Sequence, residues 1–133
     1  MVKIKKYSLK FWITSFLPLT LWMSIIFYFS SQQKIAVTNE YWLSFAIFKT
    51  LHLIEYATLY ALSLRFFHYL NSPQKYLYAF ILTVAYAATD ELHQRFVPTR
   101  EGKPRDVFID SLGALASFLI IKNTPLLKRI IFL

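Results

Sequence analysis

The first long apolar stretch of the chain decides the fold class. Residues 11–33 read FWITSFLPLTLWMSIIFYFSSQQ, 23 consecutive residues without a formally charged side chain. At about 1.5 Å per residue, a helix of this length crosses the ~30 Å hydrocarbon core of a bilayer. The stretch is long for the apolar part of a signal peptide, and no small-residue cleavage site follows it. We therefore predict an uncleaved transmembrane helix over residues 11–29, with Pro18 as a point of bending.

Composition extends this expectation to the whole chain. The 133 residues are 56% hydrophobic, more apolar material than a small soluble domain buries. There is no cysteine, which excludes disulfide scaffolds, thiolate metal sites and cysteine nucleophiles. Three further apolar runs cover about 50–67, 76–92 and 106–121, and Asn71-Ser72-Pro73 marks a turn between the first two of them. We predict one domain over residues 1–133, an all-α integral membrane bundle of four transmembrane helices.

Charge is distributed unequally between the two sides that four crossings define. One side receives nine basic residues and no acid, and the other receives six basic residues and all seven acids. The nine are Lys3, Lys5, Lys6, Lys10, Arg65, Lys75, Lys122, Lys128 and Arg129. The positive-inside rule then predicts a multi-pass protein of the cell membrane with both termini cytoplasmic. The net charge of +8 is thus a topology signal, and no nucleic-acid partner is expected.

Ionisable residues gather near the outer ends of three predicted helices. Each such residue is costly in a membrane and indicates a functional or structural role. The fourth helix also carries a stripe of small residues that suits a close helix–helix contact. We expect a polar site at the outer face. Its residues are Lys49, His52, Glu55 and Tyr56 on the second helix, Asp90, Glu91, His93 and Gln94 on the third, and Asp106 and Asp110 on the fourth. The small residues of the stripe, toward its inner end, are Gly113, Ala114 and Ser117.

The same residues resemble the motifs of the VanZ-like family. They are Phe29-Ser30-Ser31-Gln32, Lys49-x-x-His52-x-x-Glu55-Tyr56, Asp90-Glu91-Leu92-His93-Gln94-Arg95-Phe96-Val97-Pro98-x-Arg100 and Asp106-x-x-x-Asp110-x-x-Gly113. The resemblance covers most of the chain and implies a small four-helix membrane protein. The family's founder is associated with low-level teicoplanin resistance in Gram-positive bacteria. One position departs from the pattern: the family often has glycine where this chain has Thr99, and a β-branched residue resists positive φ.

The resemblance and the charge pattern together suggest recognition of an anionic, lipid-linked or peptide-bearing component of the cell envelope. Membrane lipids are the other expected partners. In this hypothesis Arg100 contacts the anion, and the carboxylates orient it or move protons. The ligand-binding candidates are Lys49, Tyr56, Gln94, Arg100, Asp106 and Asp110. The catalytic candidates are Glu55, Asp90, Glu91, His52 and His93, with a pairing of Glu55 to Asp90 or Asp110 across helices preferred.

Other interpretations stay open at this point. An outer-leaflet hydrolase or transferase would use the same carboxylates and histidines. A transporter ranks lower, because the inner halves of the helices lack acids. A structural subunit of a larger membrane complex would use a small-residue face such as Gly113 and Ser117 between chains. The polar residues would alternatively form a salt-bridge network that holds the loop before Asp106 over the bundle. His52 and Glu55 resemble half of a di-metal site, but no second pair exists, so no metal and no cofactor are assigned.

Overall fold

The structure, a computed structural model, describes residues 8–33 and 39–133. All secondary structure in these ranges is helical. The elements are α1 (Leu9–Phe11), a π-helical turn (Trp12–Phe16), α2 (Leu17–Ser30), α3 (Tyr41–Tyr69), α4 (Lys75–Gln94), α5 (Pro104–Asn123) and α6 (Pro125–Ile131). Lys3, Lys5, Lys6 and Lys34, which contribute to the predicted topology, lie outside the described residues.

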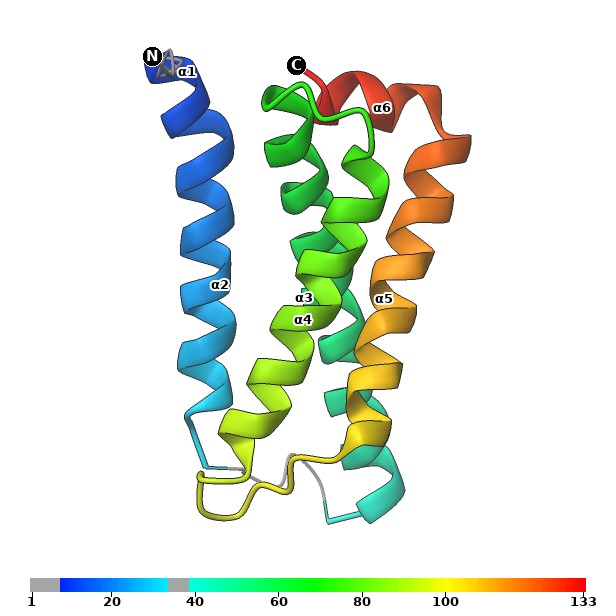
Figure 1. Cartoon of the computed structure of the whole chain (residues 1–133). Helices are drawn as coiled ribbons and strands as arrows, with labels where there is room; N and C mark the ends of the chain where they lie inside the picture. The colour runs from blue at the N-terminus through cyan, green and yellow to red at the C-terminus, as the bar shows by residue number, and fades with distance from the viewer. Residues whose placement is uncertain (1–7, 34–38) are drawn as a thin grey trace.

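The four long helices run alternately up and down (Figure 1). Helix α3 packs against α5, α4 and α2, so it is central to the bundle. The start of α3 and the loop of residues 95–103 lie at one end, which we call the loop end. Helix α1, the turn at residues 70–74 and α6 lie at the opposite end. Consequently the ends of α2 and α4 and the starts of α3 and α5 meet at the loop end.

Proline positions explain where the helices begin and change course. Pro18 has no N–H to offer the carbonyl one turn earlier, and the chain forms the π-helical turn directly before it. Pro104 and Pro125 stand in the first turns of α5 and α6, where no N–H is needed. Thr124, which precedes Pro125, is extended, and α6 turns away from α5 by 107°. Helix α6 was not predicted from the sequence.

The aromatic segment that was expected near the membrane interface forms the start of α3. Tyr41, Trp42, Phe45 and Phe48 occupy its first two turns, so the second predicted helix is extended by nine residues at its beginning. The whole helical stretch Leu9–Ser30 and helices α4 and α5 lie close to the predicted ranges, with ends that differ by one to two residues.

Apolar side chains form two core clusters and also cover much of the surface. One cluster centres on Tyr56 and Leu59, the other on Tyr60 and Leu64. Large apolar side chains are exposed on all four long helices, while several charged and hydroxyl-bearing side chains are buried between them. Polar groups inside and apolar groups outside are the arrangement that a lipid environment favours.

Within the described residues, one helical stretch, Leu9–Ser30, is long and apolar enough to span a membrane. The bent pair formed by Pro104–Asn123 and Pro125–Ile131 gives a second candidate if its two parts act as one span. The all-helical fold is therefore confirmed, whereas the bundle of four membrane-spanning helices stays a prediction.

Candidate functional site

Two ion pairs join α3 to α5 near the loop end. Lys49 Nζ lies 2.8 Å from Asp106 Oδ1, and His52 Nδ1 lies 3.3 Å from Asp110 Oδ1. Spacings of three and four residues place each pair of side chains on one face of its helix. Asp106 is 7% exposed and Asp110 is fully buried. A basic face of α3 therefore meets an acidic face of α5.

Gly113 brings these two helices unusually close together. A Cβ atom at this position would lie 2.5 Å from the Leu53 carbonyl oxygen, which is backbone and has little freedom to move. Leu53 follows His52 in α3, and Gly113 lies one turn after Asp110 in α5. The close contact predicted for the small residues of this helix is confirmed. It also fixes how near His52 and Asp110 approach each other.

Helix α4 contributes a buried carboxylate that is held by two hydrogen bonds. Tyr56 Oη donates to Asp90 Oδ2 at 3.1 Å, and Gln94 Nε2 donates to the same oxygen at 3.0 Å. Asp90 is 4% exposed, and its Oδ1 atom has no hydrogen-bond partner among the described residues. Asp90 is thus fixed in position with one acceptor atom left over.

Glu91 connects α4 to the loop of residues 95–103. Its Oε2 atom accepts a hydrogen bond from the Lys103 backbone N–H at 3.0 Å. Gly102 lies so close that a Cβ atom there would overlap the Glu91 carbonyl oxygen. Arg95 Nε donates to the Gly102 carbonyl at 3.2 Å. Together these contacts hold the loop against the end of α4.

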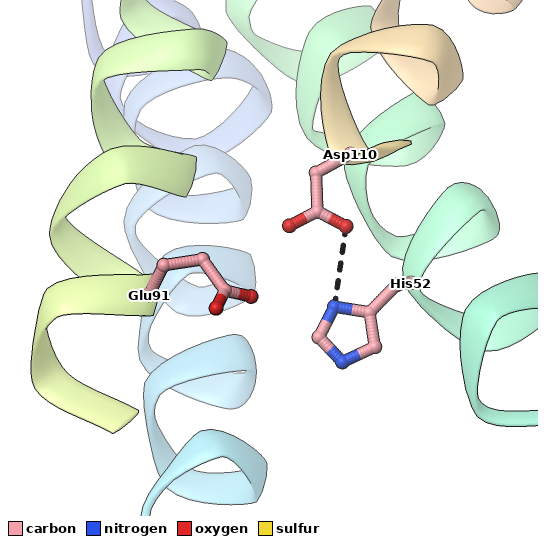
Figure 2. A group of neighbouring side chains, drawn as sticks. All are labelled: His52, Glu91 and Asp110. Atoms are coloured by element: carbon pink, nitrogen blue, oxygen red, sulfur yellow. Dashed lines mark ion pairs between the residues drawn. The ribbon is translucent and has the colours of Figure 1, made fainter. Parts of the chain in front are cut away.

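Three side chains, one each from α3, α4 and α5, converge between these helices. Figure 2 shows His52 from α3, Glu91 from α4 and Asp110 from α5, with their functional groups turned toward a common space. One potential ligand atom from each residue lies within 4.8 Å of the other two. We call these residues the His52–Glu91–Asp110 group. Glu55 and His93 are not members of it.

Arg100 and His93 attach the loop end to α2. Arg100 Nε donates to the Gln32 carbonyl at 2.6 Å, and one Nη donates to the Phe29 carbonyl at 2.8 Å. Phe29 lies in the last turn of α2 and Gln32 follows two residues after this helix ends, so Arg100 ties the loop to the end of α2. His93 Nε2 lies 3.0 Å from Ser31 Oγ. The structure therefore places His93 beside Ser31 at the end of α2, outside the His52–Glu91–Asp110 group.

Arg100 also carries a positive charge close to several carboxylates. Burial lowers the pKa of its guanidinium, and the carboxylates of Asp90, Glu55 and Glu91 act in the opposite direction. Arginine stays protonated at neutral pH in either case. Two of its five N–H groups donate to α2, so the side chain has donors left for a ligand.

Two cavities open at the loop end and share Phe48, His52 and Arg100. The first, the loop cavity, has a volume of about 300 Å³ and lies between the start of α3 and the 95–103 loop. Its other lining residues are Tyr41, Phe45, Lys49, Gln94, Thr99, Glu101, Lys103, Arg105 and Asp106. The second, the helix cavity, measures about 310 Å³ and lies between α2, α3 and α4. It is lined by Ile26, Phe29, Ser30, Gln32, Leu51, Glu55 and Asp90 as well.

Glu55 lines the helix cavity together with Asp90. We expected Glu55 to pair with Asp90 or Asp110 across helices. The Asp110 carboxylate faces His52, whereas Asp90 Oδ2 accepts from Tyr56 and Gln94 and leaves Oδ1 without a hydrogen-bond partner among the described residues. A pairing of Glu55 with Asp90 therefore stays a prediction.

Thr99 adopts the backbone conformation that glycine favours. Its φ angle is 67°, in the left-handed region, so the turn keeps a glycine-like shape despite the β-branched side chain.

The sequence did not predict the carbonyls that accept hydrogen bonds from Arg100, or the Lys103 N–H that donates to Glu91. Backbone groups leave no signal in a residue pattern, so these contacts required coordinates.

The fold and the site define a class of protein: a small helical bundle with an apolar exterior and a buried group of carboxylates and imidazole at one end. Within that class, the family model described as VanZ/LLP1 matches residues 11–129, and the chain belongs to this family. No curated protein and no solved structure matches the chain.

Proposed function

We propose that this VanZ-family chain is a multi-pass protein of the bacterial cell membrane, with both termini cytoplasmic, and that its loop cavity binds the anionic part of a lipid-linked or peptide-bearing envelope component. The exposed apolar side chains of the four long helices support the membrane location. So does the apolar stretch Leu9–Ser30. The excess of lysine and arginine at the end opposite the loop supports the orientation.

The positive charge of the loop cavity is the observation from which we infer an anionic ligand. Four basic side chains and two acidic ones line it, a surplus of two positive charges before His52 is considered. The basic residues are Lys49, Arg100, Lys103 and Arg105. Arginine matches the geometry of phosphate and carboxylate groups, so an anion is the complementary ligand.

The surroundings of the cavity suit a ligand that is part lipid. Tyr41, Phe45 and Phe48 form an aromatic side of the cavity at the start of α3. Aromatic rings are favoured at the level of lipid headgroups. A phosphate-bearing lipid would therefore place its charge among the basic residues and its chain along the apolar exterior. Sequestering or altering such a component of the envelope would account for teicoplanin-type resistance.

Native mass spectrometry of the detergent-purified chain tests this proposal. The test variant is Lys103→Gln/Arg105→Gln in the loop cavity, and the matched control is Lys128→Gln/Arg129→Gln on α6 at the other end. At about 1 kcal/mol per charge near a lipid surface, the loop variant should retain a polyprenyl phosphate roughly 30-fold less well. The α6 variant should bind as the unmodified chain does.

Equal retention by the two variants would remove the loop cavity from ligand binding. Phosphatidylglycerol should be included as a second probe, because preferential binding of polyprenyl phosphate identifies an envelope precursor rather than a general anionic lipid. Arg100→Ala is a poor first test, since it also releases α2 from the 95–103 loop.

A second candidate function is an enzyme of the outer leaflet, a hydrolase or transferase acting on such a component. The observation that favours it is the His52–Asp110 pair, in which a fully buried carboxylate faces an imidazole that lines the loop cavity. Such a pair is suited to general-base chemistry. Asp110→Asn would then abolish turnover of the bound component while its retention persists, and unchanged turnover would exclude this role.

A further inference from the structure

The His52–Glu91–Asp110 group has the composition and convergence of a metal site. We propose that it binds a divalent first-row transition metal ion, with zinc as the best-matched ion and manganese as its competitor. Each of the three central helices supplies one residue, and one potential ligand atom of each lies within 4.8 Å of the others. Residue spacing alone does not predict this site, because it pairs His52 with Glu55 on the same helix and not with residues of α4 and α5.

Asp110 supplies an independent indication that a cation is needed. It is 0% exposed, and neither carboxylate oxygen has a hydrogen-bond partner among the described residues. Its single ion pair, to His52 at 3.3 Å, involves Oδ1 and leaves Oδ2 without a partner. In Figure 2 the carboxylate points into the space that it shares with the His52 ring and the Glu91 side chain. Buried carboxylates are normally hydrogen-bonded, paired or bound to a metal.

The spacing of the pair fits two ligands of one ion. Zinc–nitrogen and zinc–oxygen bonds of about 2.1 Å separate two tetrahedral ligand atoms by about 3.4 Å. His52 Nδ1 and Asp110 Oδ1 are 3.3 Å apart. Glu91 would be the third protein ligand, since one potential ligand atom of each residue lies within 4.8 Å of the other two. The Lys103 N–H that donates to Glu91 would orient this carboxylate, since metal ligands are usually held by a further hydrogen bond from the protein.

The donor set selects the kind of metal. One imidazole and two carboxylates favour zinc, manganese or iron, and the absence of sulfur disfavours copper(I). Three protein ligands leave a coordination position open, as in catalytic zinc sites. His52 also lines the loop cavity, so the proposed metal site adjoins the place where an anion would bind. The metal site does not depend on the proposed ligand, and each is testable without the other.

Zinc binding by the full-length chain in detergent provides the test. After treatment with a chelator and its removal, zinc chloride is added and affinity is measured by calorimetry, with metal content determined by mass spectrometry. We expect one zinc ion per chain. Asp110→Asn, Glu91→Gln and His52→Gln should each weaken binding by more than the roughly 10- to 100-fold that outer-shell groups contribute.

A control variant separates this site from incidental binding. His68 lies in the last turn of α3, at the end of the bundle opposite the loop. The variant His68→Gln should bind zinc as the unmodified chain does. The proposal would be overturned if His68→Gln lost as much zinc affinity as Asp110→Asn, or if Asp110→Asn bound zinc as tightly as the unmodified chain.

A measurement on the unmodified chain removes any dependence on variants that fold poorly. X-ray absorption at the zinc edge should show one imidazole with oxygen ligands. Coordination by several imidazoles, or by water alone, would contradict the His52–Glu91–Asp110 group as the binding site.

Discussion

Replacing Gly113 by alanine tests the contact that brings α3 and α5 together. The added Cβ would lie 2.5 Å from the Leu53 carbonyl oxygen, where ordinary contacts begin at 3.4 Å. The helices must separate locally by the difference, about 0.9 Å, because the atoms that the Cβ would meet all belong to the Leu53 backbone. Overpacking of this kind costs about 1–3 kcal/mol. Alanine recovers about 1 kcal/mol in helix propensity, so a net destabilisation of up to about 2 kcal/mol is expected.

The assay is unfolding of the purified chain in detergent, followed by circular dichroism. Ala116→Gly serves as the matched control, since Ala116 is exposed on the same helix and its replacement isolates the propensity effect. The separation should also weaken zinc binding, because His52 and Asp110 flank the contact. If Gly113→Ala raised the free energy of unfolding by the propensity difference, the close contact would not exist in the folded protein.

Three further predictions address individual side chains. Thr99→Gly relieves the left-handed backbone at φ 67° and should stabilise the chain by about 1 kcal/mol in the same unfolding assay; a destabilised variant would contradict that turn. Tyr56→Phe removes a buried hydrogen bond to Asp90 and should cost about 1–2 kcal/mol, whereas no change would mean that Asp90 is not bonded there. Burial, and secondarily Lys75, lowers the pKa of His68, so its contribution to stability is full above the usual histidine pKa and is lost as the pH falls. An NMR titration should show this low pKa, and Lys75→Met should raise it; a His68 pKa above the usual value would refute the arrangement.

Much of the fold follows from apolar run length and turn residues. The uncharged stretch of residues 11–33 and the Asn71-Ser72-Pro73 turn are both local signals. The extent of α3 was underestimated because its first turns are rich in aromatic residues that also suit a membrane interface. Helix α6 was missed because seven residues that include Lys128 and Arg129 do not form an apolar run.

The sequence predicted the end of the bundle at which the acidic residues gather, but not which side chains contact one another there. Alternation of the helices was enough to predict that the acidic residues gather at one end. The partners of Asp110 and Asp90 depend on how far each helix is rotated about its axis. That rotation is set by contacts such as Gly113 against Leu53, which involve backbone atoms and have no counterpart in side-chain spacing.

The 107° bend before α6 has a practical consequence for experiments. It folds the last helix across the end of the bundle that is farthest from the 95–103 loop (Figure 1). An affinity tag, a fluorophore or a surface tether attached after Leu133 would therefore leave both cavities unobstructed. Immobilised in this way on a sensor chip, the protein would present its cavities to the flowing solution.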